Sequence, residues 1–172
     1  MKLPKLILSD IDGVWTDGGM YYATDGIELK KFHTYDSAGI LFCKIAGIKT
    51  GIISGEDISV VKRRAEKLNV DYCFLGIKNK VKVIDELLNE TGIKWEEIAY
   101  LGDDINDMGM LKKAGFSGVV SSAPDYMKSY ADYITKKRGG EGAFREFVEF
   151  ILTKNNKIDE ILENIEHRIF NQ

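Results

Sequence analysis

Short apolar runs alternate with longer amphipathic segments along most of this sequence. The apolar runs have the length of buried strands, and the segments between them have helical periodicity. This alternation is typical of a parallel sheet covered by helices. We therefore expect an α/β fold, with strands at 5–9, 48–54, 70–75, 98–101, 118–120 and 133–134 and helices at 37–46, 57–68, 80–90, 107–114, 126–130 and 144–152.

A single domain accounts for nearly all of the 172 residues, which are enough to bury a core. We predict this domain over residues 1–153, followed by a C-terminal helical tail over 154–172. Within the domain, two alternating apolar segments flank Thr24-Asp25-Gly26, and an Asp-Gly pair in this position indicates a hairpin. The hairpin is expected over residues 19–32.

The composition is that of a soluble globular protein, with 44% hydrophobic and 30% charged residues and a formal net charge of -3. This balance does not favour a nucleic-acid partner or an anionic membrane surface. No apolar run is long enough for a signal peptide or a membrane helix, so we expect a cytoplasmic protein. Cys43 and Cys73 lack metal-ligand spacing, and both are expected to be buried thiols in a reducing compartment.

Polar residues follow three of the predicted strands: Asp10-Ile11-Asp12-Gly13, Ser54-Gly55 and Gly102-Asp103-Asp104. Parallel strands of an open sheet bring such ends to one edge, where active sites form. Carboxylates crowded there would repel one another unless a divalent cation lay among them, and oxygen ligands of this kind suit Mg²⁺. One Asp-x-Asp is a weak signal, but two acidic clusters with a Ser and a Lys between them are much stronger.

These motifs resemble those of the haloacid dehalogenase phosphatase superfamily. Residues 10–14 are similar to its first motif, 53–55 to its second, Lys80 to its third and 102–107 to its fourth, so that the resemblance spans Leu6 to Phe150. It implies a Rossmann-like fold, with a mainly parallel sheet, helices on both faces and a protruding β-hairpin. The intervals between the motifs are too short for a cap domain, which is typical of the capless subgroup.

The resemblance assigns chemical roles that agree with the residue types. Asp10 would attack phosphorus and form an aspartyl-phosphate. Asp12 would protonate the leaving alkoxide and later deprotonate water, while its backbone carbonyl binds the metal. Ser54 and Lys80 would hold the transferring oxygens. Lys78 competes for the role of Lys80, which we favour because it lies nearer the predicted helix start.

Asp103 is the expected second carboxylate ligand of the magnesium ion, beside Asp10. Asp104, Asn106 and Asp107 are weaker candidates for the site. Of the two acids, one could orient water or Lys80, while the other could cap a helix.

Within the capless subgroup, residues 10–18, 32–40 and 137–146 resemble phosphatases of 3-deoxy-2-keto sugar acids. This implies a small sugar-acid phosphate as substrate. We favour the nine-carbon 2-keto-3-deoxynononate 9-phosphate, with N-acetylneuraminate 9-phosphate as a close variant. The alternative is 3-deoxy-D-manno-octulosonate 8-phosphate, the eight-carbon acid of lipopolysaccharide.

Substrate contacts are expected from Thr34, from Gly55 beside Ser54, and from three charged residues after the second motif. Glu56, Arg64 and Lys67 fall within one quadrant of an ideal helix, and they resemble the nine-carbon group. The eight-carbon group commonly has Arg directly after Ser-Gly. A solvated helix face is the alternative explanation. Arg138, in a glycine-rich loop, is a further candidate for the rim of the site.

The apolar side chains of the hairpin are expected to be covered by another subunit, because a monomer would leave them exposed. The related capless phosphatases form tetramers through such hairpins, so we expect a homotetramer in which Arg64 and Lys67 reach a neighbouring site. The alternative is a hairpin folded onto its own core. A non-catalytic phosphate-binding module and a receiver domain are the alternatives to an enzyme, and the presence of Asp12 argues against the receiver.

Overall fold

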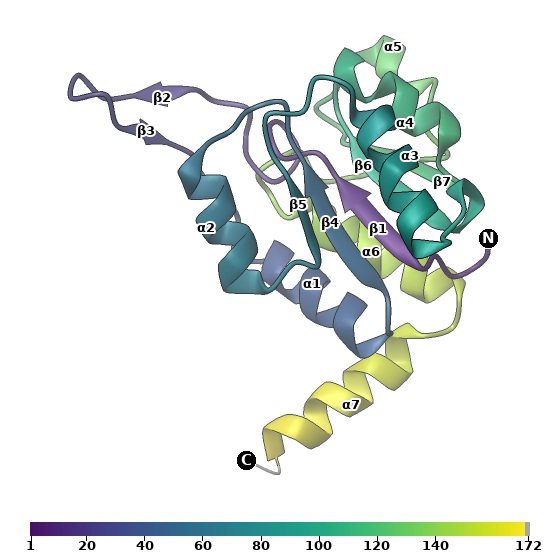
Figure 1. The fold of residues 1–172 in the computed structure, drawn as a ribbon. Coiled ribbons are helices and arrows are strands. Elements are labelled where there is room, and N and C mark those ends of the chain that lie inside the picture. The colour runs from purple at the N-terminus through teal and green to yellow at the C-terminus, as the bar shows by residue number, and fades with distance from the viewer. Residues whose placement is uncertain (171–172) are drawn as a thin grey trace.

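The computed structural model describes residues 1–170 and contains a six-stranded sheet in which every pair of neighbours is parallel. The strand order is β5-β4-β1-β6-β7-β8 (Figure 1). Its members are β1 (Leu6–Ser9), β4 (Lys49–Ile53), β5 (Tyr72–Phe74), β6 (Ile98–Gly102), β7 (Phe116–Val119) and β8 (Tyr133–Ile134). The expected α/β fold with a mainly parallel sheet is confirmed.

Strand β1 lies in the middle of the sheet and determines where the polar strand ends meet. All four of its residues are buried, as a strand covered on both faces requires. Its last residue, Ser9, is level with Ile52 of β4 and Leu101 of β6. The residues that follow these three strands therefore emerge side by side at one edge.

Helices cover both faces of the sheet, as expected. The α-helices are α1 (Asp36–Ile45), α2 (Ser59–Leu68), α3 (Lys80–Thr91), α4 (Met108–Lys113), α5 (Asp125–Lys128), α6 (Ala143–Lys154) and α7 (Ile158–Phe170), and 3₁₀ turns occur at Trp95–Glu97 (η1) and Ile105–Asp107 (η2). Helices α1 and α6 pack together, and so do α3 and α4 on the opposite side of the sheet (Figure 1). Within residues 1–170, the segments between Asp12 and Lys80 form the hairpin, α1, β4, α2 and β5 and no cap domain.

Aromatic side chains fill much of the core between the sheet and α6. Trp15 and Phe144 are both buried, with ring centroids 4.6 Å apart. Phe147 stacks on Phe116 at 5.6 Å. The burial of such rings is the largest source of apolar stabilisation in this layer.

Several local expectations differ from the structure. Strand β7 begins at Phe116 rather than at residue 118, and α4 spans Met108–Lys113 rather than 107–114. Helix α2 begins at Ser59 rather than at residue 57, because Ile58 still has an extended backbone. Cys43 is buried as expected, but the prediction of a buried Cys73 is wrong. Cys73 lies on β5, which is an edge strand of the sheet and pairs with another strand, β4, on one side only.

The hairpin between β1 and α1 projects from the sheet edge (Figure 1). Its paired segments, β2 (Tyr21–Tyr22) and β3 (Glu28–Leu29), are shorter than expected, and one isolated bridge between Thr16 and Phe32 closes its base. Gly26 adopts a φ of 84° in the turn, a conformation that glycine accepts without strain. The large exposed side chains of the hairpin are Met20, Tyr21, Tyr22, Ile27 and Leu29.

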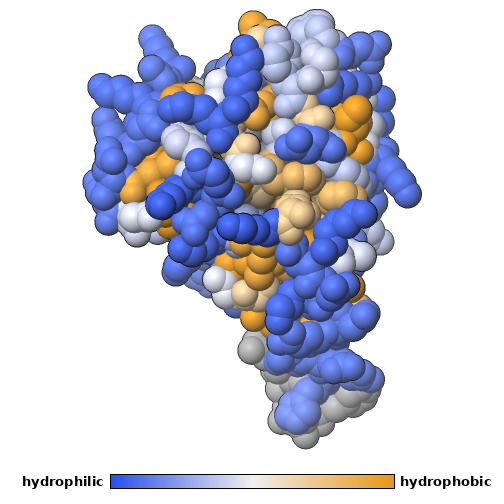
Figure 2. All heavy atoms as spheres, turned by 90° about the vertical axis from the view of Figure 1, so that its right-hand side faces the viewer, coloured by the Kyte–Doolittle hydropathy of each residue, from blue (hydrophilic) through white to orange (hydrophobic). Residues whose placement is uncertain are grey.

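The C-terminal segment forms α7, which projects from the body of the molecule. Ile161 is buried against the core while Leu162 remains about half exposed. Figure 2 shows a mostly hydrophilic surface on the side of this helix that faces the viewer. The expected helical tail is thus a helix through residue 170, and residues 171–172 of that prediction lie outside the described part. Among residues 1–170, each helix is too short or too polar to form a transmembrane span.

The close packing of β7 against α6 gives a test of the core. A Cβ atom at Gly118 would lie 2.8 Å from Cδ2 of Phe147, closer than real contacts allow. We expect Gly118→Ala to lower the free energy of unfolding by about 1–3 kcal/mol through overpacking, measured by urea denaturation. In the Phe147→Leu background the same substitution should cost less, since the ring is gone. Equal costs in both backgrounds would contradict this packing.

Candidate active site

The strand ends predicted to carry the chemistry meet at one edge of the sheet. Asp10 follows β1, Ser54 follows β4 and Asp103 follows β6, and these three strands are neighbours. The Asp10 amide donates to the carbonyl of Leu101 at 3.0 Å, which continues the pairing of β1 and β6 into the site. Asp10 and Ser54 are almost fully buried.

A tight loop after β1 lets two acidic strand ends approach each other. Gly13 has a φ of 78°, and a Cβ atom there would lie 2.7 Å from Cγ of Asp103. Glycine is therefore required both for the turn and for the close approach of the Asp103 carboxylate. The amides of Val14, Trp15 and Thr16 all donate to the carbonyl of Ile11, which keeps the loop compact.

Lys80 joins the nucleophile candidate to the acids after β6. Its Nζ lies 2.9 Å from Oδ1 of Asp10 and 2.7 Å from Oδ1 of Asp107. Asn79 caps α3 by accepting from the amide of Lys82, so that Lys80 is the first helical residue and points back to the strand ends. Lys80 is buried whereas Lys78 is exposed, so the structure places Lys80 in the expected position.

Asp107 has the most partners of any acid in the site. Its Oδ1 accepts from Lys80 and from the Tyr100 hydroxyl, and its Oδ2 accepts from the amides of Asp103 at 2.9 Å and Asp104 at 3.4 Å. Of the two roles left open for Asp104 and Asp107, Asp107 therefore orients Lys80. Asp104 caps η2, accepting from the amide of Ile105 at 2.7 Å.

Tyr100 was missed by the sequence analysis because it lies inside an apolar strand pattern that predicts only core. It is fully buried, and its hydroxyl contacts both Asp107 and Lys80. Burial, and then the negative charge of Asp107, raise the pKa of this hydroxyl, so it remains a neutral donor. The buried Tyr100 hydroxyl therefore helps to position the Asp107 carboxylate and the Lys80 ammonium.

The electrostatics of the cluster favour a cation. Burial raises the pKa of Asp10 to about 7, and the nearby Asp107 contributes. Burial also raises the pKa of Asp103 to about 8, with contributions from Asp10 and Asp107. For Lys80, burial alone would lower the pKa, but Asp10 and Asp107 outweigh it and the pKa is raised. Carboxylates held together against this cost are typical of a metal centre.

The donor set fits a magnesium ion. Oxygen atoms of Asp10, Asp103 and Asp107 lie within 4.8 Å of one another. Since Asp107 is already saturated by Lys80, Tyr100 and backbone amides, Asp10 and Asp103 are the carboxylates with free acceptor capacity. Two carboxylates with room for waters and a phosphate suit Mg²⁺. The backbone carbonyl of Asp12 remains the predicted third protein ligand.

Asp12, the predicted acid and base, lies at the mouth of the site with its side chain 29% exposed. Its Oδ2 lies 3.5 Å from the Ser54 hydroxyl, which in turn accepts from the amide of Glu56 at 3.1 Å. Its Oδ1 lies 2.5 Å from Nζ of Lys30. The sequence analysis missed Lys30, because strand alternation does not reveal which face of a hairpin turns toward the body.

The residues predicted to contact substrate are more dispersed. Thr34, Gly55, Glu56, Asn106 and Arg138 are all exposed. Gly55 and Glu56 directly follow Ser54. The loop after Arg138 packs on residues 10–16, which follow β1 and are here called the nucleophile loop. The Gly140 amide donates to the carbonyl of Val14 at 3.0 Å.

Arg64 and Lys67 lie beside the base of the hairpin. The two residues line a surface cavity of about 260 Å³ together with Phe32, Val60 and Arg63. An Nη atom of Arg64 donates to Ser37 at 3.0 Å and to the His33 carbonyl at 3.3 Å, so this chain's own residues hold part of its guanidinium. Lys67 is exposed.

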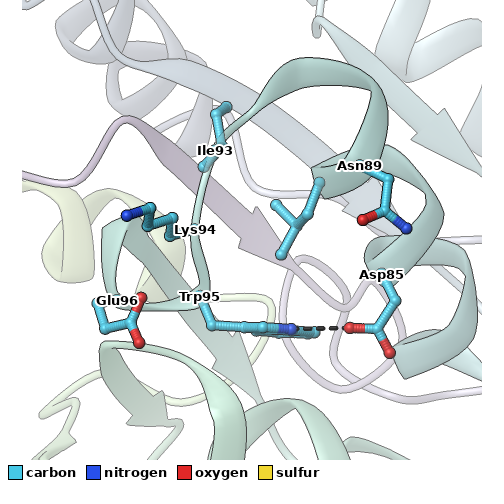
Figure 3. A pocket seen from close by; sticks show the side chains of 7 residues that line it. Asp85, Asn89, Ile93, Lys94, Trp95 and Glu96 are labelled. Carbon is cyan, nitrogen blue, oxygen red and sulfur yellow. Dashed lines mark hydrogen bonds between the residues drawn. The ribbon is translucent and has the colours of Figure 1, made fainter.

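A larger cavity of about 420 Å³ lies between α3 and η1 (Figure 3). The Trp95 indole lines one side of it and donates to Asp85 at 2.8 Å. None of the predicted site residues lines it. Because η1 precedes β6, this cavity lies at the opposite edge of the sheet from the strand ends. It is therefore separate from the acidic centre.

The fold and the acidic centre together define a phosphoryl-transfer hydrolase, and comparisons with known proteins agree. Residues 76–147 match the model of the haloacid dehalogenase-like hydrolases. The chain is 35% identical over 156 residues to the 3-deoxy-D-manno-octulosonate 8-phosphate phosphatase of Escherichia coli K12, covering 91% of this chain and 83% of that protein. This chain belongs to the haloacid dehalogenase-like hydrolases and is a phosphatase.

Solved structures give the same result. The 3-deoxy-D-manno-octulosonate 8-phosphate phosphatase of Moraxella catarrhalis, in complex with magnesium, phosphate and KDO, matches with a TM-score of 0.90 and 34% identity over 94% of this chain and 93% of that one. The cobalt-bound Haemophilus influenzae enzyme matches with a TM-score of 0.83 and 36% identity over 87% of this chain and 88% of that one. These metals agree with the expected magnesium cofactor.

The raised carboxylate pKa values predict how magnesium binding depends on pH. Protons and the cation compete for Asp10 and Asp103, whose pKa values of about 7 and about 8 mean that the metal-free protein is protonated there in mild acid. Affinity for Mg²⁺ should therefore rise between about pH 6 and about pH 9, with release of protons on binding. Titration calorimetry in two buffers of different ionisation enthalpy measures both quantities.

The control for this titration is Asp103→Asn, which should weaken binding at every pH. A dissociation constant of the unsubstituted protein that stays the same across this range would contradict the competition.

Proposed function

We propose that this phosphatase hydrolyses the 9-phosphate of a nine-carbon 2-keto-3-deoxy sugar acid, 2-keto-3-deoxynononate 9-phosphate or N-acetylneuraminate 9-phosphate. The observation that carries the reaction is the contact of the Lys80 ammonium with Asp10, beside the Asp103 carboxylate. A buried carboxylate next to a fixed cation can approach a phosphate dianion without strong repulsion. Catalysis of phosphoryl transfer depends mainly on such positioning and charge stabilisation.

In the proposed reaction, Asp10 attacks phosphorus and the bond from phosphorus to the sugar oxygen breaks. Asp12 gives its proton to the departing oxygen. In the second step, Asp12 takes a proton from water, and the resulting hydroxide displaces Asp10 and forms inorganic phosphate. Ser54 and Lys80 hold the equatorial oxygens in both steps. Asp10, Asp103 and the carbonyl of Asp12 would hold a magnesium ion, which would neutralise negative charge on the transferring group.

The preference for a nine-carbon acid rests on the residue after Ser54-Gly55. Glu56 is exposed and directly follows Ser54-Gly55, and its amide donates to the Ser54 hydroxyl at 3.1 Å. A carboxylate can accept hydrogen bonds from the hydroxyls of a longer polyol chain, whereas an Arg there would bind anions. The second candidate is 3-deoxy-D-manno-octulosonate 8-phosphate, which the names of the related phosphatases favour.

The remaining substrate contacts in this proposal come from a neighbouring subunit. The hairpin exposes Tyr22 at 69% and Leu29 at 57%, an unusual amount for side chains of this size in a monomer. A second copy packed on the hairpin would cover them. Arg64 and Lys67 lie beside the hairpin base, and in a homotetramer they would pair with the carboxylate of a sugar acid bound next door.

The first test is a phosphatase assay on a panel of sugar-acid phosphates with added Mg²⁺. We expect the highest kcat/KM for a nine-carbon 9-phosphate. Asp10→Asn, which keeps the size of the side chain, should abolish turnover because an amide does not attack phosphorus usefully. Turnover by Asp10→Asn would contradict the mechanism, and a preference for the eight-carbon phosphate would contradict only the choice of substrate.

A substitution at Glu56 separates the two substrate candidates further. Glu56→Arg should lower kcat/KM for the nine-carbon phosphate by about tenfold or more, through loss of hydroxyl contacts worth roughly 1–3 kcal/mol. The loss for a simple aryl phosphate should be small, because that substrate has no polyol chain. Equal losses on both substrates would show that Glu56 acts on the chemistry rather than on recognition.

The shared-site proposal predicts complementation between two inactive variants. Asp10→Asn lacks the nucleophile and Arg64→Ala lacks the neighbouring contact, so mixed oligomers should recover part of the activity on the sugar-acid phosphate. The assay is activity after joint refolding, with light scattering to follow oligomer size. The control is Tyr22→Lys with Leu29→Lys, which should dissociate the oligomer and remove recovery. Full activity of a monomer would contradict the proposal.

A further inference from the structure

Lys30 differs from the other lysines of the hairpin region in its burial. Its side chain is 1% exposed, whereas that of the adjacent Lys31 is 67% exposed and points to Asp17. Residues 28, 30 and 32 alternate on one side of the strand, and Phe32 of this set packs against the core. The side of the hairpin that carries these three residues therefore faces the body of the molecule. Lys30 on this side reaches Asp12 at the candidate active site.

The Lys30 ammonium ends between two carboxylates. Its Nζ lies 2.5 Å from Oδ1 of Asp12 and 3.9 Å from Oε1 of Glu28. A buried ammonium is costly unless it is paired, so the contact with Asp12 is what makes this position of Lys30 favourable. A lysine that served only the hairpin would extend into solvent as Lys31 does.

The other oxygen of Asp12 faces the predicted phosphate site. Oδ2 lies 3.5 Å from the Ser54 hydroxyl. With Oδ1 fixed by Lys30, the carboxylate plane has one orientation, and Oδ2 is the oxygen directed to the group that Ser54 would hold. Without Lys30, the side chain of Asp12, which is partly exposed, could rotate among its rotamers.

We propose that Lys30 is a positioning residue: from the hairpin, its ammonium holds the Asp12 carboxylate so that Oδ2 faces the leaving oxygen. The proposal rests on the proposed function, in which Asp12 donates the proton. It adds a link between the hairpin and the chemistry. Any neighbour that covers the hairpin would also fix Lys30, and through it Asp12.

The test compares Lys30→Met with the matched control Lys31→Met on two substrates. An alkyl phosphate has a basic leaving oxygen and needs the proton from Asp12, whereas p-nitrophenyl phosphate has a weakly basic one and needs it far less. For Lys30→Met we expect kcat/KM on the alkyl phosphate to fall by about 10²-fold, the lower end of a general-acid contribution. The kcat/KM on the aryl phosphate should fall much less, because this ratio reports the transfer of the phosphoryl group to Asp10 and not the later step in which Asp12 deprotonates water.

Lys31→Met should behave as the unsubstituted protein on both substrates. If Lys30→Met does not fold, Lys30→Gln keeps a polar group in the buried position, but it lacks the ammonium and is too short to reach Asp12, so it should show the same selective loss. Thermal melting of each variant shows whether the protein is folded at the assay temperature.

Three outcomes would overturn the proposal. Equal losses of kcat/KM on both substrates would mean that Lys30 does not act through proton donation to the leaving oxygen. A raised KM with unchanged kcat would mean that Lys30 binds the phosphate instead. Unchanged kinetics of folded Lys30→Met and Lys30→Gln would mean that Lys30 is only structural.

Failure of the proposed mechanism, on which the role of Lys30 rests, is recognised separately. In that case Asp10→Asn would keep its turnover of the alkyl and the aryl phosphate with Mg²⁺ present. The proposal for Lys30 fails alone when the unsubstituted protein is active and the variants lack the selective loss.

Discussion

The ion pairs of Lys80 hold the site together. This one buried ammonium contacts Asp10 and Asp107 at the same time, and both carboxylates are almost inaccessible to water. Without it, two buried negative charges would face each other beside Asp103. Lys80 therefore makes the cluster possible, but it neutralises only part of the negative charge. Burial, and then the remaining negative charge of the neighbouring carboxylates, raise the pKa values of Asp10 and Asp103, and a divalent cation would offset both effects.

The sequence predicted most of the fold and the centre of the site, because both depend on local patterns. Apolar runs indicate buried strands, and polar residues just after them indicate a sheet edge where Asp10, Ser54 and Asp103 converge. One partner of Asp107, the Tyr100 hydroxyl, could not be predicted in this way. Tyr100 is one residue in an apolar strand, and its hydroxyl meets Asp107 only through the packing of η2 against β6. Cys73 was predicted wrongly for a related reason, since an apolar strand does not reveal that it lies at an edge.

Lys30 shows a different limit of sequence reasoning. Alternation separates the two faces of a hairpin but does not say which face meets the body, and that choice depends on the bridge between Thr16 and Phe32 at the hairpin base. Helical periodicity likewise does not reveal what Arg64 contacts. In the structure its guanidinium donates to the His33 carbonyl and to the Ser37 hydroxyl. The strand ends of the site are thus set by strand register, whereas the residues proposed for substrate recognition lie on loops and helix faces, which local sequence patterns position less well.

The nucleophile loop is confined from two sides, which explains the need for glycines around it. On one side, the Asp103 carboxylate occupies the space that a side chain at Gly13 would need. On the other, a Cβ atom at Gly139 would collide with the backbone of Gly13, and the Gly140 amide donates to the carbonyl of Val14. Because the loop is held by backbone contacts on both sides, Asp10 has little freedom to move. The nucleophilic role proposed for Asp10 would benefit from this rigidity, since misplacement by about 1 Å can cost about 10²-fold in rate.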